Sequence, residues 1–149
     1  MKVALINIKD SEMEVVFSVT KVALFPYVDA VFGWDDNFQR ARLANEYDLN
    51  WYFWIYQGRE RVGLVCYKHV TTRLHLHLLI IFPEFQGRGI GAQVMDLLKQ
   101  EAIDASRQTM TLSSFIANSE ALRFYTELGY AIEESDKDFY HLTLAVEEA

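Results

Sequence analysis

Three glycines, a glutamine and an arginine lie together in residues 86–91, which read Gln-Gly-Arg-Gly-Ile-Gly between an apolar run and an amphipathic one. Glycines after a strand let a ligand approach the backbone, and the first turn of a following helix has N–H groups without internal partners. The helix dipole adds about half a positive charge there, and Arg88 adds a full one. The stretch therefore predicts an anion site, with a diphosphate as the expected occupant.

Two other phosphate motifs do not fit the residues around Arg88. A P-loop ends in Gly-Lys-Ser/Thr, whereas this loop ends Gly89-Ile90-Gly91-Ala92. The G-x-G-x-x-G spacing of dinucleotide-binding folds would need a glycine at position 92, and the acidic residue expected about 20 residues later is missing. The simpler alternative is a glycine-rich turn that only tightens a strand-to-helix junction.

Two histidines precede this loop on a run in which apolar and polar residues alternate. His75 and His77 are two positions apart, so on a strand their side chains point to the same face. An imidazole titrates near pH 6.5 and suits proton transfer. A metal would need a third ligand that the sequence does not identify, so no metal is expected. The simpler alternative is a half-buried sheet face on which neither histidine has a chemical role.

Composition limits the classes of protein to consider. The chain has 149 residues, 51% of them apolar, which predicts one domain over residues 1–149 with its own core. Its formal net charge of −7 argues against nucleic acid as a partner and favours cations. Cys66, the single cysteine, is expected to be a small buried residue, and the lack of an intrachain disulfide fits a reducing compartment. No stretch approaches ~20 apolar residues and no signal peptide is evident, so we expect a cytoplasmic protein without a membrane partner.

The elements that must position these residues form a mixed α and β chain. Strands are predicted over residues 3–8, 51–57, 61–69, 71–82, 109–116, 131–134 and 139–146. A first helix starts near Ser11, which has capping-box spacing to Glu14, and Pro26 ends or kinks it. Further helices are predicted over residues 36–47, 90–107 and 120–128. One β–loop–α–β unit therefore surrounds the glycines.

Two blocks of the sequence resemble the GNAT N-acetyltransferases. Residues 86–91 match the Gln/Arg-x-x-Gly-x-Gly/Ala signature of that superfamily, with an apolar strand and Pro83 before it. Residues 118–130, Asn-Ser-Glu-Ala-Leu-Arg-Phe-Tyr-Thr-Glu-Leu-Gly-Tyr, are similar to a second block of the family and follow about one helix and one strand later. The order of predicted elements over residues 3–82 is similar too, so the resemblance covers nearly the whole chain.

The resemblance implies an α+β fold with a mixed, strongly bent sheet of six to seven strands, flanking helices and a V-shaped split between strands 4 and 5. Acetyl-CoA would lie in that split. Backbone groups of Leu79 and Ile81 would pair with its pantetheine arm, and Asn118 would contact the pantetheine or the acyl region. The backbone N–H groups that would hold the pyrophosphate belong to Gln86, Gly87, Arg88, Gly89, Ile90, Gly91 and Ala92.

Acetyl transfer to an amine needs a neutral nucleophile, a stabilised oxyanion and a proton for the departing thiolate. By the family's pattern Tyr125 is the general acid, because a phenol with a pKa near 10 is protonated at pH 7. His77 stands where many GNAT proteins carry a glutamate, and we predict it as the general base, acting directly or through a water. Glu46, Asp35 and Asp36 are alternatives that would bind a cationic acceptor or take its proton.

The resemblance thus implies an enzyme that moves an acetyl group from acetyl-CoA to a primary amine by direct attack in a ternary complex. The acceptor would be a small molecule, an amino sugar, a polyamine or a protein amine, and we expect it to be cationic. Trp34, Trp51 and Trp54 would either line the acceptor pocket or pack in the core.

The alternative function, from another class of protein, is a non-catalytic coenzyme-A-binding sensor or regulatory module. A third, a nucleotide-binding domain, is disfavoured because the P-loop lysine is missing. Dimers are common among proteins of this resemblance, so a homodimer is one option for an oligomeric state that the sequence leaves open.

Overall fold

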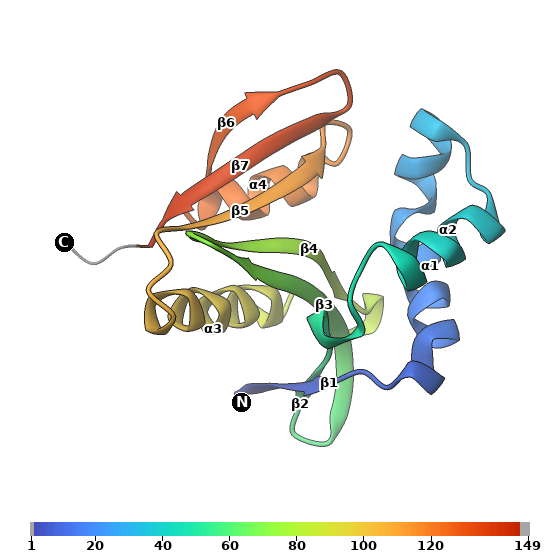
Figure 1. Cartoon of the computed structure of the whole chain (residues 1–149), viewed down its shortest axis with the longest axis horizontal. Helices are drawn as coiled ribbons and strands as arrows, with labels where there is room; N and C mark the ends of the chain where they lie inside the picture. The colour runs from blue at the N-terminus through green and yellow to red at the C-terminus, as the bar shows by residue number, and fades with distance from the viewer. Residues whose placement is uncertain (1, 147–149) are drawn as a thin grey trace. The chain divides into compact units, whose positions relative to one another are not determined.

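The strands of the chain form one mixed sheet with the order β1-β2-β3-β4-β5-β7-β6 (Figure 1). The structure, a computed structural model, describes residues 2–146. The predicted α+β fold with a six- to seven-stranded sheet is confirmed, with seven strands in the described residues. The chain divides into two compact units, Met1–Cys66 with Leu78–Ile90, and Tyr67–His77 with Gly91–Ala149. The expectation of one domain over residues 1–149 stays a prediction.

The first unit begins with a meander of aromatic and β-branched strands. β1 (Val3–Asn7) pairs antiparallel with β2 (Tyr52–Gln57), and β2 pairs antiparallel with β3 (Glu60–Val70). Such side chains favour strands because they pack well on a pleated, half-buried surface. The tight turn between β2 and β3 depends on Gly58, whose φ of 63° is one that other residues rarely adopt.

The helices of the first unit differ from the prediction at two points. A 3₁₀ turn, η1 (Asp10–Glu12), precedes α1 (Met13–Phe32), and the Glu12 carboxylate accepts a hydrogen bond from the Lys9 N–H at 2.9 Å. The capping contact therefore lies two residues before the predicted Ser11–Glu14 pair. Pro26 does not end α1, which runs on to Gly33, where a φ of 76° stops it.

The helix that follows this break is shorter than predicted. α2 (Asp36–Asn45) ends two residues before the predicted end, and the 3₁₀ turn η2 (Leu49–Trp51) leads into β2. α1 and α2 lie against one another in the first unit (Figure 1). Tyr52 fixes α2 to the sheet, because its buried hydroxyl donates a hydrogen bond to the Leu43 carbonyl at 3.3 Å.

The core of the first unit lies between α1 and the inner face of the strands. Its fully buried members come from β2, β3 and α1, and Cys66 is one of them, which confirms the prediction that it is a small core residue. Trp54 is 1% exposed and carries the Arg61 guanidinium 4.1 Å from its ring centroid. Of the two roles expected for the tryptophans, Trp54 therefore has the one in the core.

One observation bears on the expectation about long apolar stretches. Within the 23-residue helical run Asp10–Phe32, an 18-residue stretch has a mean hydropathy of 1.6, so by length and composition alone the helix would suffice to cross a membrane. Only 22% of that 18-residue stretch is buried. Val16 and Phe17 nevertheless pack in the core of the first unit, so the fold accounts for part of this apolar character.

The second unit contains β5, β6 and β7 together with the end of β3, the start of β4 and two helices. β5 (Thr109–Phe115) pairs antiparallel with β7 (Phe139–Ala145), which pairs antiparallel with β6 (Ala131–Ser135). α4 (Ser119–Glu127) lies along one face of these strands (Figure 1). α3 begins at Ile90 and ends at Asp104, three residues before its predicted end. Its buried side chains are Ile90, Val94, Met95, Leu98 and Ala102.

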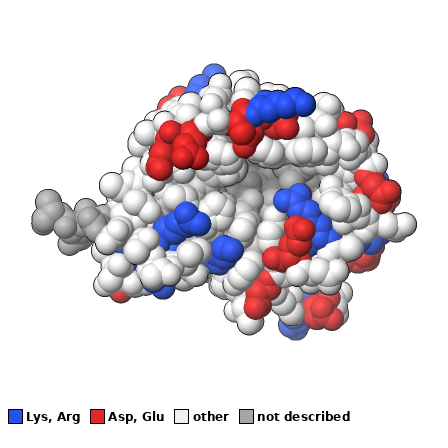
Figure 2. Space-filling model, turned by 45° about the horizontal axis from the view of Figure 1, so that its top comes forward, with Lys and Arg blue, Asp and Glu red and all other residues white. Residues whose placement is uncertain are grey.

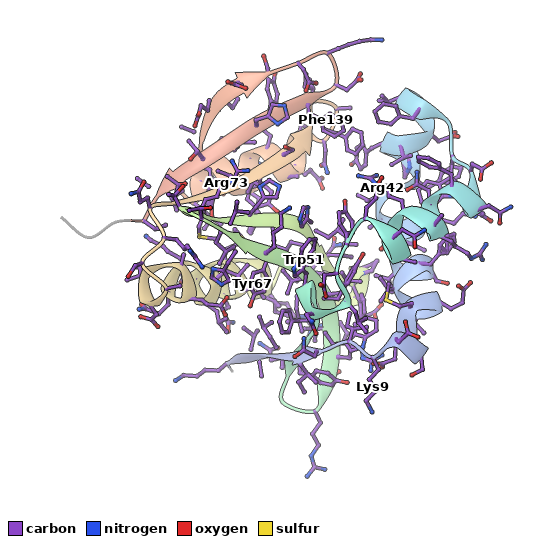
Figure 3. The ribbon with its side chains drawn as sticks, in the orientation of Figure 1. Lys9, Arg42, Trp51, Tyr67, Arg73 and Phe139 are labelled. Carbon is purple, nitrogen blue, oxygen red and sulfur yellow. The ribbon has the colours of Figure 1, made fainter. Side chains whose placement is uncertain are left out.

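The connection between α3 and β3 is polar. Tyr67 points from β3 toward α3 (Figure 3), where its hydroxyl donates a hydrogen bond to the Glu101 carboxylate at 2.9 Å. The other oxygen of that carboxylate lies 2.7 Å from His69 Nε2. Arg107 in turn donates to His69 Nδ1 at 3.0 Å. These contacts hold the end of α3 against β3 within the second unit.

β4 (Arg73–Ile81) is the strand that leads to the glycine loop. It pairs in parallel with β5 from Arg73–Thr109 to Leu76–Leu112, while β4 goes on to Ile81 and β5 to Phe115. The fourth and fifth strands therefore part after four residue pairs, as the predicted split between them requires. A 3₁₀ turn, η3 (Pro83–Phe85), follows β4 and stops it, because Pro83 cannot donate to a ladder.

Candidate active site

The glycine loop joins η3 to α3 and is built from backbone in an unusual conformation. Gly87 and Gly89 both have a φ of 76°, and a Cβ at either position would meet no protein atom within 4 Å. Glycine is therefore needed there for its backbone conformation, and the backbone is open to approach. Gly91 lies inside the first turn of α3 and has no such φ, so its effect is to remove a side chain from the helix start.

The start of α3 has what an anion site needs. The helix has 15 residues, so its aligned peptide dipoles add up to a substantial dipole whose positive end lies at the N–H groups of the first turn. Ile90, the first residue of the helix, is 1% exposed, so its buried side chain anchors the helix start. The Arg88 guanidinium lies 5.4 Å from the centre of the Phe85 ring, which keeps its charge near the loop. Phosphate oxygens are the ligands that this arrangement favours.

The last residues of β4 lie unusually close to β3. A Cβ on Gly63 would overlap the Ile80 carbonyl oxygen and lie 3.1 Å from the Ile81 Cα. The Phe82 N–H donates to the Val62 carbonyl at 2.9 Å, and the Gln86 side-chain amide donates to the Ile81 carbonyl at 2.9 Å. Sequence reasoning missed Gly63, although a glycine inside a strand pattern is a known signal of close backbone approach.

The two predicted histidines do share one face of β4. Their ring centroids are 4.8 Å apart, and His75 Nδ1 lies 2.7 Å from the Thr111 hydroxyl on β5. Burial, with smaller effects from Arg73 and Lys68, lowers the pKa of His75 to about 4. His75 is therefore neutral at pH 7, with its ring against that of His77.

The same face continues onto β5 and β7 with a second set of polar groups. Ser113 and His141 are directly opposite in the β5–β7 register, and the Ser113 hydroxyl lies 2.7 Å from His141 Nδ1. His141 Nε2 lies 2.9 Å from the carboxylate of Asp136 in the β6–β7 turn. Sequence reasoning did not find this group, because no motif links residues so far apart in the chain.

The α4 region positions the other two predicted residues. Asn118 caps α4, since its side-chain oxygen accepts a hydrogen bond from the Ala121 N–H at 3.2 Å. Tyr125 is 8% exposed and packs its ring 5.0 Å from Phe124 and 5.8 Å from Tyr130. Burial raises the pKa of the Tyr125 phenol well above its usual value, so the hydroxyl is protonated at neutral pH.

Tyr125 and the histidines lie on opposite sides of β5. Tyr130, the ring neighbour of Tyr125, directs its hydroxyl to the Met110 sulfur at 3.5 Å. His75 instead contacts Thr111, the next residue along β5. Because successive residues of a strand point to opposite faces, the phenol belongs to one face of β5 and the imidazoles to the other.

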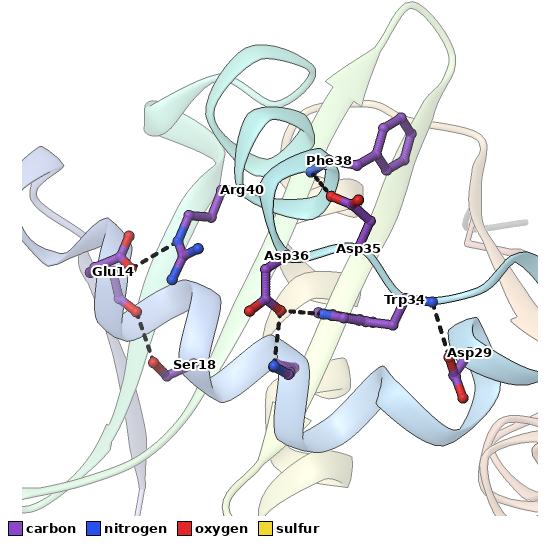
Figure 4. Close-up of polar contacts among 9 residues, drawn as sticks. Glu14, Ser18, Asp29, Trp34, Asp35, Asp36, Phe38 and Arg40 are labelled. Carbon is purple, nitrogen blue, oxygen red and sulfur yellow. Dashed lines mark hydrogen bonds and ion pairs between the residues drawn. The ribbon is translucent and has the colours of Figure 1, made fainter.

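The acidic residues predicted to hold a cationic acceptor are each engaged within the first unit, and Figure 4 shows the contacts of Asp35 and Asp36. The Asp36 carboxylate lies 2.9 Å from Lys21 Nζ and accepts a hydrogen bond from Trp34 Nε1 at 2.6 Å. The Asp35 carboxylate caps α2 by accepting from the Phe38 N–H at 2.8 Å. Glu46 pairs with Arg42 at 3.0 Å. These contacts stabilise the α1–α2 connection.

The surface charge is mixed rather than of one sign. Acidic and basic side chains are interspersed over the face drawn in Figure 2, despite the net charge of −7. Among residues 2–146, no group of three metal-ligating side chains is placed to hold a metal ion.

A cavity of about 490 Å³ opens within the first unit beside the end of β4. α1 and the residues after Ile80 form its walls, and Gln86 lies at its border with the glycine loop. Its lining is Ser18, Val19, Val22, Ala23, Ile80, Phe82, Pro83, Glu84 and Gln86. The wall is therefore mostly apolar.

Comparison with known proteins agrees with this geometry. Residues 18–130 match the model of the acetyltransferase (GNAT) family. The acetyltransferase PseH of Campylobacter jejuni is 28% identical over 94 residues, and this match spans 62% of the present chain but only 59% of PseH.

Two solved structures share the fold at low sequence identity. PaiA N-acetyltransferase from Thermoplasma acidophilum, solved with coenzyme A, is 12% identical with a TM-score of 0.75, covering 97% of this chain and 99% of that one. Arabidopsis thaliana Naa50, solved with a bisubstrate analogue, CoA-Ac-MVNAL, is 18% identical with a TM-score of 0.64, covering 97% and 99%. Since the family model spans most of the chain, this protein belongs to the acetyltransferase (GNAT) family.

Proposed function

We propose that the protein transfers the acetyl group of acetyl-CoA to a primary amine by direct attack in a ternary complex. The observation that carries this proposal is the loop at the start of α3, where two glycines at a φ of 76° precede a 15-residue helix and Arg88 stands between them. Membership of the GNAT family supports the same donor.

Acetyl-CoA, when bound, supplies an activated acetyl group on a thiol that can leave. In the proposal the N–H groups of residues 86–92 hold its diphosphate, and backbone groups of Leu79 and Ile81 pair with the pantetheine. The Ile81 carbonyl already accepts from Gln86, but a carbonyl has a second lone pair for another donor. Asn118 uses its oxygen as the cap of α4, which leaves its NH₂ group to donate to the ligand.

Tyr125 and His77 are the proposed acid and base. Burial keeps the Tyr125 phenol protonated, so it can give a proton to the departing thiolate. His77 follows the neutral His75 on the opposite face of the strands, where an approaching amine can give up a proton. The oxygens of Asp35, Asp36 and Glu46 are used within the first unit, so the proposal assigns them no part in the reaction.

The proposed acceptor is the amine of a small molecule or a peptide. Naa50, a protein of the same fold, was solved with an analogue that joins coenzyme A to a peptide, which supports an amine acceptor in general. The cationic character of the acceptor, a homodimer and a cytoplasmic location stay predictions.

The test is a free-thiol release assay with acetyl-CoA across small amines, aminoglycosides, polyamines and peptides. Tyr125→Phe should lower kcat about 100-fold while the acetyl-CoA Kd from calorimetry stays within about twofold, because the phenol acts on the leaving group. Tyr130→Phe is the matched control, since its hydroxyl contacts only the Met110 sulfur and its loss should leave kcat nearly unchanged. Tight acetyl-CoA binding with no turnover on any amine would instead identify a sensor, and absence of acetyl-CoA binding would contradict both.

A further inference from the structure

We propose that Ser113, His141 and Asp136, called here the relay, take the first proton from the ammonium group of the acceptor. This inference rests on the proposed amine acetylation and concerns which groups accept the protons that the amine loses in that reaction.

The geometry of the relay is that of a hydroxyl, a base and an orienting carboxylate. The Ser113 Oγ to His141 Nδ1 distance is 2.7 Å, and the His141 Nε2 to Asp136 Oδ2 distance is 2.9 Å. The carboxylate is fixed in turn, because its Oδ1 accepts hydrogen bonds from the N–H groups of Asp138 and Phe139, both at 2.9 Å. Each partner therefore has a defined orientation.

The charge on Asp136 decides which nitrogen of His141 can accept a proton. The pKa of Asp136 is held below its usual value, first by the Asp138 N–H and then by His141 and the Phe139 N–H. An ionised carboxylate only accepts, so the neutral imidazole must carry its hydrogen on Nε2. Nδ1 then presents its lone pair to the Ser113 hydroxyl, which donates to it.

The position of the relay follows from strand register. Leu76–Leu112 is the last pair between β4 and β5, so His77 and Ser113 are the next residues along the two strands. Thr111 and Ser113 point to the same face of β5, and Thr111 contacts His75 on that face. The relay therefore continues the row of histidines at the point where the two strands part.

The amine nitrogen gives up two protons, and the relay offers an acceptor for the first of them besides His77. A Lys-type amine has a pKa near 10.4 and arrives protonated at pH 7. Its nitrogen loses one proton to become nucleophilic and another, to His77, as the amide forms, while the leaving thiolate takes up one from Tyr125. Tyr125 then regains a proton from solvent, so that the net reaction releases one proton. In the relay, the ammonium gives a proton to Ser113 Oγ as the Oγ hydrogen passes to His141 Nδ1. The Asp136 carboxylate then stabilises the imidazolium, which releases the proton to water because the His141 side chain is 40% exposed.

Two carboxylates and a neutral imidazole around His141 bear on its pH dependence. Glu134 of β6 is opposite His141 in the register, and Asp136 contacts it directly. From β4, His75 faces the same side and is neutral at pH 7, because burial lowers its pKa to about 4. A protonated His141 therefore has the carboxylates of Glu134 and Asp136 and the neutral imidazole of His75 around it.

The experiment measures kcat/KM for an amine acceptor between pH 6 and 10 in the parent and in variants. His141→Gln keeps hydrogen-bonding groups but cannot take a proton, so kcat/KM should fall about 100-fold at pH 7 and approach the parent value near pH 10, where the amine deprotonates unaided. Ser113→Ala should behave in the same way, and Ser113→Thr, which restores the hydroxyl, should recover most of the rate. His69→Gln is the matched control. Both ring nitrogens of His69 are already bonded, one to Glu101 and one to Arg107, so this replacement should leave the pH profile of kcat/KM unchanged.

Two further measurements keep the outcome decisive. A loss in His141→Gln that is the same at every pH would indicate a structural role and overturn the relay, as would an acetyl group found on Ser113 by mass spectrometry. Nitrogen NMR of His141 in the parent reports the tautomer without any turnover: hydrogen on Nε2 is expected, and hydrogen on Nδ1 would overturn the relay. If acetyl-CoA binds and amines are acetylated while the relay tests fail, the proposed function stands and this inference does not.

Discussion

Replacing Gly63 with alanine would test how the backbone at the end of β4 is positioned. The new Cβ would overlap the Ile80 carbonyl oxygen and lie 3.1 Å from the Ile81 Cα. Both neighbours are backbone atoms, so no side-chain rotation relieves the overlap. β3 and β4 must therefore separate by roughly an ångström at this point.

The expected effect has two parts. Forcing an extra carbon into a packed site costs about 1–3 kcal/mol, and about 2 kcal/mol would lower the Tm of a chain of this size by about 4–8 °C. The same displacement moves the backbone of Ile81, which the proposed function uses to pair with pantetheine. Loss of one such hydrogen bond weakens acetyl-CoA binding about tenfold, equivalent to about 1.4 kcal/mol.

A second glycine of the same sheet provides the control. Gly58 lies in the β2–β3 turn, outside β4, with a φ of 63°, so Gly58→Ala costs about 1–2 kcal/mol of backbone strain. Urea unfolding and calorimetry with acetyl-CoA would be run on both variants. We expect both to be less stable and only Gly63→Ala to bind acetyl-CoA more weakly. Equal acetyl-CoA affinity in all three proteins would refute the argument that Gly63 sets the backbone used by the ligand.

Two further predictions concern a buried imidazole and the glycine loop. The free energy of unfolding should fall as the pH is lowered from about 6.5 to about 4, because unfolded His75 binds a proton in this range whereas the folded pKa is about 4; this stability is fully present above pH 6.5. His75→Gln should flatten this part of the curve, and an unchanged slope in urea unfolding would contradict the assignment. Gly89→Ala, which forces a Cβ onto a φ of 76°, should weaken acetyl-CoA binding about tenfold but leave acetyl-pantetheine, which lacks the diphosphate, nearly unaffected. If calorimetry shows that the binding of acetyl-CoA and of acetyl-pantetheine is weakened equally, the diphosphate does not bind at the glycine loop.

The parts of the fold that could be predicted from the sequence are those with a local physical cause. α2 begins at Asp36 as predicted, because the Asp35 side chain bonds the Phe38 N–H of its first turn, and α3 begins at Ile90 directly after the glycine loop. Alternation of polar and apolar residues placed His75 and His77 on one face of β4, as their ring contact confirms. Each of these signals lies within a few residues of the feature that it specifies.

Features that depend on contacts between distant segments could not be predicted in this way. Pro26 looks like a helix end, yet α1 runs on to Phe32, and Val28 beyond the proline is buried. Asp36 looks like a ligand for a cation, yet Lys21 and Trp34 already bond its carboxylate. No local pattern shows these pairings.

Strand register hides the relay from sequence analysis in the same way. Ser113 meets His141 only because β5 and β7 pair in one particular register, and a slip of a single residue would turn the imidazole to the other face. Asp136 joins them through the β6–β7 turn, whose backbone N–H groups fix its carboxylate. No sequence motif links Ser113, Asp136 and His141. Their contact therefore becomes visible only once the pairing of the strands is known.

The arrangement of acid and base about β5 bears on the order of events in the reaction. Tyr125 belongs to the Met110 side of the strand, whereas His77 and the relay belong to the Thr111 side. Under the proposed function, the proton donor for the leaving thiolate and the proton acceptors for the amine would therefore approach the reacting carbon from different sides of β5. An acetyl group held first on the chain would need an accessible nucleophile, and Cys66 is fully buried in the core of the first unit. The burial of Cys66 thus supports the proposed direct attack in a ternary complex over transfer through an acetylated cysteine.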